Sequence, residues 1–164
     1  MKRALQAACL LCACSVASAS SVETPPLSGE TAKFLSRAGL ILASRSASTD
    51  PGVTQSQRAC IASVRPESMA SDYQKVLSQE LSAAELAKLD AFFASSAGQK
   101  YVDAMINDEP LDKMTLEELE YMDHEVGTAS INNVFKVASP ANPRAKKILD
   151  PALHATFGAC FEKV

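Results

Sequence analysis

The sequence predicts an all-α fold, a compact bundle of about six helices. Apolar residues recur three and four residues apart along nearly the whole chain after Pro26. Two S/T-x-x-E capping boxes, beginning at Ser82 and Thr115, mark helix starts. No run of useful length alternates between apolar and polar residues, as a half-buried strand would.

The first half of the domain is expected to hold helices over 28–46, 53–64 and 67–81. A Ser-Thr-Asp-Pro-Gly turn separates the first two, and Arg65-Pro66 ends the second, because a residue before proline avoids helical conformations. The expected inward stripes are Phe34, Leu35, Ala38, Ile41 and Leu42 in the first helix and Met69, Tyr73, Val76, Leu77 and Leu81 in the third.

A helical hairpin is expected next, because the Ser82 box opens one helix and Ser95 or Ser96 caps another after a turn over 94–98. Its expected inward residues are Leu86, Leu89, Phe92, Phe93, Tyr101, Val102, Met105 and Ile106. One long helix is predicted from Thr115 to Ala138. Pro143 then begins a closing helix, which Pro151 is expected to kink or restart.

The N-terminus has the pattern of an export signal. Lys2 and Arg3 precede an uncharged apolar run, and Ala17-Ser18-Ala19 is a small-x-small cleavage site, which predicts a signal peptide over 1–19. A lipobox-like Leu11-Cys12-Ala13-Cys14 gives the alternative of a lipoprotein signal over 1–13 with Cys14 acylated and anchored to the outer membrane. Residues 20–27 are then a linker, and 28–164 form a single domain in the periplasm.

Either route leaves Cys60 and Cys160 as a thiol pair in an oxidising compartment. We expect them to form a structural disulfide, since no Cys-x-x-Cys spacing indicates a redox pair. Closing a loop of about 100 residues contributes roughly 4–5 kcal/mol in the chain-entropy model.

Removal of the leader leaves 14 basic and 19 acidic residues, a net charge of −5. This balance argues against a nucleic-acid partner. The acids concentrate between Asp103 and Glu125, where Lys113 is the one base, and they are either a solvated helix start or a docking face for a basic protein. The candidate binding residues are Asp108, Glu109, Asp112, Glu117, Glu118, Glu120 and Asp123.

Catalytic and metal-binding patterns are weak in this sequence. Glu117, Glu120 and His124 share a face of the predicted long helix, but one His with carboxylates lacks the spacing of a specific metal site. His154 follows Asp150 by four residues, yet no strained turn offers a nucleophile, so we interpret it as structural. We predict no cofactor, no metal and no catalytic residues.

The stretch from Leu81 to Lys100 resembles a domain-of-unknown-function family of small helical domains in exported bacterial proteins, whose core reads F-T-x-E-E-L-x-x-L-x-x-F-Y-x-S-P-x-G-x-K. The resemblance extends over about residues 69–105. The residues that fall on this pattern are Ser82, Glu85, Leu86, Leu89, Phe92, Phe93, Ser95, Gly98 and Lys100. The departures are Ala84 in place of the first Glu, Phe93 in place of the usual Tyr and Ser96 in place of the usual Pro. The resemblance implies an all-α periplasmic domain and no particular activity.

Together these features favour an exported, non-enzymatic protein-binding domain of the bacterial envelope. Its most concrete form is an immunity or inhibitor protein that neutralises a secreted antibacterial toxin. The alternatives are a helical accessory factor of envelope homeostasis and an envelope hydrolase that uses Glu/Asp and His124.

Overall fold

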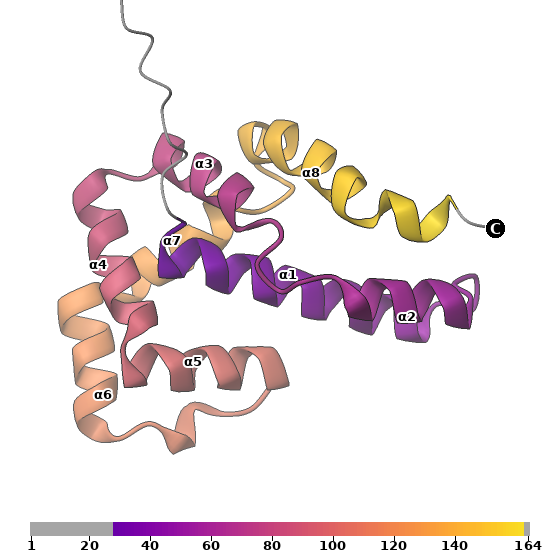
Figure 1. The fold of residues 1–164 in the computed structure, drawn as a ribbon. Helices are drawn as coiled ribbons and strands as arrows, with labels where there is room; N and C mark the ends of the chain where they lie inside the picture. Colours follow the sequence, from indigo (N-terminus) through magenta and orange to yellow (C-terminus); the bar gives the residue numbers. More distant parts are fainter. Residues whose placement is uncertain (1–27, 163–164) are drawn as a thin grey trace, which may run out of the picture.

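The computed structural model describes residues 28–162, which form only helices and the connections between them (Figure 1). The α-helices are α1 (Glu30–Thr49), α2 (Gln55–Ser63), α3 (Ala70–Glu80), α4 (Ala83–Ala94), α5 (Ser96–Asn107), α6 (Leu116–Tyr121), α7 (Thr128–Val137) and α8 (Pro143–Phe161). The all-α prediction is confirmed. The predicted signal peptide, Cys14 and the linker over 20–27 lie outside the described residues.

The main core lies where α1, α4, α5 and α7 meet. Its centre is aromatic: Phe34 of α1 stacks on Phe93 of α4 with ring centroids 4.6 Å apart, and Phe92 packs edge-on against Phe93 at 5.2 Å. Both α4 phenylalanines are fully buried, as their spacing predicted. Core aromatic contacts of this kind add about 0.5–1.5 kcal/mol beyond burial alone.

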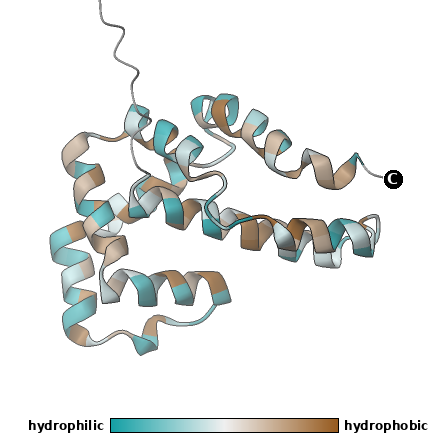
Figure 2. Ribbon diagram, in the orientation of Figure 1, coloured by the Kyte–Doolittle hydropathy of each residue, from teal (hydrophilic) through white to brown (hydrophobic). Residues whose placement is uncertain are grey.

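The prediction that Leu42 and Met105 face the core is wrong. Leu42 of α1 is 64% exposed and Met105 of α5 is 48% exposed. The periodicity places each on the apolar face of its helix, but both side chains line an open groove between α1 and α5 and do not pack into the core. Figure 2 shows that hydrophobic residue types occur in the middle of α1 and at the C-terminal end of α5.

The predicted long helix from Thr115 to Ala138 is also wrong. It divides into α6 and α7, joined by a π-helical turn over Met122–Val126 and by Gly127. Gly127 has φ 83°, a backbone conformation that residues with a Cβ rarely adopt, so the helix cannot continue through it. The break lets α6 and α7 take different directions around the core (Figure 1).

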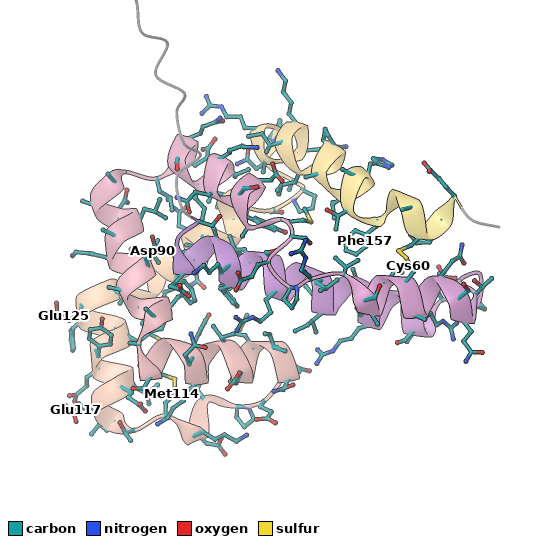
Figure 3. All side chains as sticks on the ribbon, in the orientation of Figure 1. Cys60, Asp90, Met114, Glu117, Glu125 and Phe157 are labelled. Atoms are coloured by element: carbon teal, nitrogen blue, oxygen red, sulfur yellow. A yellow bond between two sulfur atoms is a disulfide. The ribbon has the colours of Figure 1, made fainter. Side chains whose placement is uncertain are left out.

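The closing helix α8 runs without a restart from Pro143 to Phe161, with Pro151 inside it. A disulfide joins Cys60 of α2 to Cys160 of α8, with a Cα–Cα distance of 5.5 Å, which confirms the predicted pairing (Figure 3). This bond fixes the end of α8 over the α1–α2 arm, where Phe157 packs into the same small cluster.

The N-terminus of α1 is capped by a side chain from a distant helix. Asp90 of α4 accepts hydrogen bonds through Oδ1 from the Thr31 backbone N–H (2.9 Å) and from the Thr31 hydroxyl (2.6 Å). The preceding Gly29 N–H donates to Gln74 Oε1 at 2.9 Å. These bonds satisfy donors that the first turn of a helix leaves unpaired, and they hold α1 against α3 and α4.

Within residues 28–162, no helix has both the length and the apolar character needed to cross a lipid bilayer.

Candidate functional site

The start of α6 is built by two interlocking sets of hydrogen bonds. Thr115 caps the helix, receiving the Glu118 N–H on its hydroxyl, while Glu118 Oε2 accepts the Thr115 N–H at 2.8 Å. Lys100 of α5 reaches the same carboxylate, with Nζ 2.8 Å from Oε2. The hydrogen bond from Lys100 and then that from Thr115 lower the pKa of Glu118. Glu118 therefore fastens α6 to α5.

Other candidate acids also have partners inside the domain. Glu109 forms an ion pair with Lys113, and Asp123 accepts a hydrogen bond from the Thr128 hydroxyl at 3.1 Å. Asp108 ends α5 in the left-handed conformation, with φ 55°, where Asp is tolerated better than most residues. The predicted acidic segment is thus partly a set of helix ends and clamps.

Four of the candidate acids are exposed, and their side chains have no hydrogen bond or ion pair within residues 28–162: Asp108, Asp112, Glu117 and Glu120. The last three lie around the start of α6. Leu116 lies among them at the first position of α6 and is 73% exposed, the highest value for a large hydrophobic residue in the described part of the chain. Leu116 and Glu120 are one turn apart, so both project from the same side of the helix. We call Asp112, Leu116, Glu117 and Glu120 the acidic α6 face. Figure 3 shows Glu117 at the outer edge of the molecule.

Glu117, Glu120 and His124, the residues weighed as metal ligands in the sequence, do not form a metal site in the structure. No group of three or more His, Cys, Asp or Glu side chains within residues 28–162 is placed to hold a metal ion. His124 lies exposed on the π-helical turn, whose wider winding changes the angular spacing expected between it and Glu120. His154 is also exposed, on the outer side of α8, and is therefore not buried as a structural histidine usually is.

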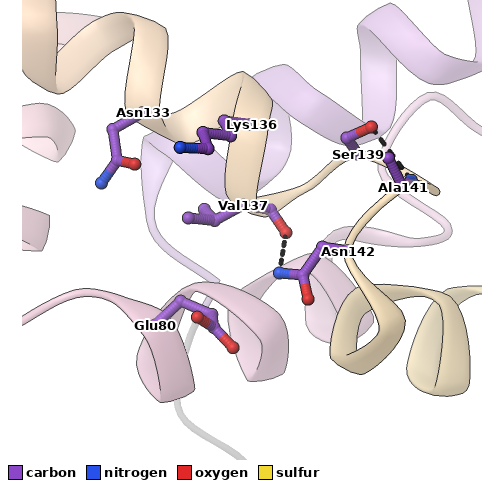
Figure 4. A pocket seen from close by; sticks show the side chains of 7 residues that line it. All are labelled: Glu80, Asn133, Lys136, Val137, Ser139, Ala141 and Asn142. Atoms are coloured by element: carbon purple, nitrogen blue, oxygen red, sulfur yellow. Dashed lines mark hydrogen bonds between the residues drawn. The ribbon is translucent and has the colours of Figure 1, made fainter.

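A polar hollow of about 550 Å³ opens between the end of α3 and the α7–α8 connection (Figure 4). Asn142 caps α8 there with its Oδ1 and donates from Nδ2 to the Val137 carbonyl at 2.8 Å. Glu80 in its wall pairs with Arg144 at 3.3 Å. Asn142 thus joins α7 to α8, and Glu80 joins α3 to α8, so we interpret the hollow as a feature of these helix connections.

The comparison with known families comes from the part of the chain that forms α3, α4 and α5. Residues 67–107, a quarter of the chain, match the family described as "Uncharacterized protein conserved in bacteria (DUF2059)". This match confirms the resemblance to a family of unknown function. No curated protein and no solved structure matches the chain.

The structure explains the residues that carry this resemblance. Ser82 and Glu85 form the predicted capping box, with the Glu85 carboxylate accepting the Ser82 N–H at 2.9 Å. Gly98 lies where α5 turns back against α4, and a Cβ there would be 2.0 Å from the Phe92 carbonyl oxygen. Lys100 supplies the ion pair to Glu118. The matched stretch therefore specifies a hairpin and the attachment of α6.

The sequence alone did not single out Leu116. An apolar residue directly after a cap and before two Glu residues was compatible with either face of the helix. The position is informative only once Leu119 and Tyr121 are seen to pack against the main core.

Proposed function

We propose that this protein is an exported, non-enzymatic protein-binding domain of the bacterial envelope that acts through the acidic α6 face. The most concrete form is a periplasmic immunity or inhibitor protein that neutralises a secreted antibacterial toxin. The partner surface would be basic, with an apolar recess for Leu116. No cofactor takes part in this function.

The exposed Leu116 carries the proposal. Leu116 is 73% exposed, the most of any large hydrophobic residue within residues 28–162, and it lies among unpaired acids; an apolar anchor inside a charged rim is the usual anatomy of a protein interface. The unpaired carboxylates of Asp112, Glu117 and Glu120 would speed association with a basic partner. The net charge of −5 after loss of the leader acts in the same direction.

The test is a pull-down from periplasmic extract, followed by affinity measurement on any stoichiometric partner. Leu116→Ala is expected to weaken binding about tenfold or more, since hot-spot truncations cost roughly 2 kcal/mol. Glu117→Gln with Glu120→Gln is expected to lower the association rate and its dependence on salt. The matched control is Glu85→Gln, an exposed capping glutamate on α4, away from this face.

Glu118 is excluded from the neutralised set because its loss would loosen α6 itself. If Leu116→Ala and the double glutamate variant both leave the partner's affinity unchanged, the acidic α6 face is not the binding surface. A partner that is a toxin-like enzyme supports the immunity function. A chaperone or assembly factor supports the accessory-factor alternative instead.

A further inference from the structure

A second apolar surface lies away from α6, in a groove between α1 and α5 with α7 at its floor. About 220 Å³ of space is lined by Phe34, Ala38, Ile41, Leu42, Met105, Ile106 and Phe135. The floor is rigid, because Phe34 meets Phe135 edge-on with ring centroids 5.8 Å apart and also stacks on Phe93. The rim is formed by the exposed Leu42 and Met105.

The volume of the groove limits what can bind in it. Ligand pockets usually enclose about 300–1,000 Å³, so this one is too small for most organic ligands. A cavity of about 150 Å³ accepts a benzene-sized group, so the groove suits one large apolar side chain. Leu42 is such a side chain, and it stands at the edge of the groove rather than in it.

The open end of the groove carries one charge of each sign, so two copies related by a two-fold axis would have complementary charges there. Arg45 follows Ile41 and Leu42 by one turn of α1, on the same side of the helix, and Asp108 ends α5 two residues after Ile106. Both are exposed, and neither is ion-paired within residues 28–162. In Figure 1 α1 and α5 run in the same direction. A two-fold axis along the groove would therefore place α1 of each copy over α5 of the other.

We propose that this groove is a self-association site at which two copies of the chain form a symmetric dimer. Leu42 of each copy enters the groove of the other, and Arg45 of each pairs with Asp108 of the other. One surface that carries both the projection and the recess is what an isologous interface requires. This inference goes beyond the proposed function and does not depend on the acidic α6 face.

The expected dimer is weak. Helix α5 has 12 residues. At 1.5 Å per residue it is about 18 Å long, and two adjacent helices are about 20 Å across, so each copy offers roughly 360 Å². Stable complexes bury about 800 Å² per partner, so this contact is less than half that size and the dimer is expected to be transient.

The experiment is sedimentation equilibrium of the disulfide-bonded protein, expressed as the full chain, from about 1 to about 300 µM. Wild type is expected to show a monomer–dimer equilibrium. Leu42→Glu is expected to raise the dissociation constant at least tenfold. The control Leu116→Glu changes another highly exposed leucine, on the acidic α6 face, and is expected to leave the dissociation constant unchanged. Neither substitution touches the core, and circular dichroism checks that both variants stay helical.

A charge exchange tests the arrangement itself. Arg45→Glu is expected to weaken the dimer about fivefold, and adding Asp108→Lys is expected to recover most of that loss.

The inference is overturned if wild type stays monomeric throughout the range, if both leucine variants lose association equally, or if the exchanged pair is no better than Arg45→Glu alone. Capture of a different protein by a monomeric wild type, lost in Leu42→Glu, would assign the groove to that protein instead. If Leu116→Glu loses the toxin-type partner but still dimerises, the proposed function and the proposed dimer are shown to use different surfaces.

Discussion

Replacement of Asp90 by alanine tests the view that a distant carboxylate holds the start of α1. The substitution removes the acceptor for both the Thr31 N–H and the Thr31 hydroxyl, at 2.9 and 2.6 Å. Loss of a helix cap costs about 0.5–2 kcal/mol, and a buried hydroxyl left without a partner costs about 1–3 kcal/mol. Thr31 is 0% exposed, so water cannot replace the lost acceptor. We expect Asp90→Ala to lower the free energy of unfolding by about 2–4 kcal/mol.

The assay is urea unfolding followed by circular dichroism, with Asp90→Asn as the matched control. Asparagine keeps a side-chain oxygen at the position of Oδ1, so less than half of the loss is expected. A double-mutant cycle with Thr31→Val should give a coupling energy near 1 kcal/mol, because the hydroxyl bond is common to both changes. A cost below about 0.5 kcal/mol for Asp90→Ala would refute the capping role, since ordinary surface substitutions fall in that range.

The Glu118 ion pair, the disulfide and Gly127 each give a further prediction. Glu118→Gln is expected to destabilise the protein at neutral pH, because the folded pKa of Glu118 lies below its usual value of 4.5. The difference in unfolding free energy between wild type and variant is therefore complete above pH 4.5 and disappears as the pH falls through the folded pKa. Urea unfolding at several pH values measures it. The double Cys60→Ser, Cys160→Ser variant should lose about 4–5 kcal/mol, since the bond spans 100 residues, and an unchanged melting temperature would contradict this. Gly127→Ala should cost about 1–3 kcal/mol of unfolding free energy through backbone strain at its positive φ. A steric clash adds nothing to this cost, because the atom nearest to a new Cβ lies 3.7 Å away. Calorimetry measures the loss.

The two proposed surfaces have different physical characters. The acidic α6 face is strongly charged around one exposed leucine, and it suits a basic partner that binds rapidly. The groove between α1 and α5 is concave and apolar, with one charge of each sign at its end. A protein that used both would present two acidic α6 faces per dimer, and binding of a toxin would then show a stoichiometry of one per chain.

The matched family region and the rest of the domain depend on each other. Residues 67–107 supply Gln74 and Asp90, which hold α1, and Lys100, which holds α6. Phe34 of α1 in turn covers Phe93 of α4. Because a hairpin of this size buries too little apolar surface alone, we interpret the surrounding helices as the remainder of one cooperative core.

The sequence by itself determined the all-α class, the Ser82 and Thr115 caps and the disulfide pairing. Each rests on short-range chemistry, on helical spacing or on the count of cysteines that follow the predicted leader. The break at Gly127 depends on a positive φ that the residue permits but does not require, so the local pattern also allowed one long helix.

Only the tertiary structure decided which apolar residues are covered. Leu42, Met105 and Leu116 have the same apolar character as their buried neighbours, and they are exposed because no other part of the described chain packs over them. The Thr31–Asp90 cap spans 59 residues and has no local pattern. Glu118 likewise became a clamp, distinct from the exposed Glu117 beside it, only through the position of Lys100. Helical periodicity fixes the direction of each side chain along its own helix, whereas burial depends on the length and placement of other helices.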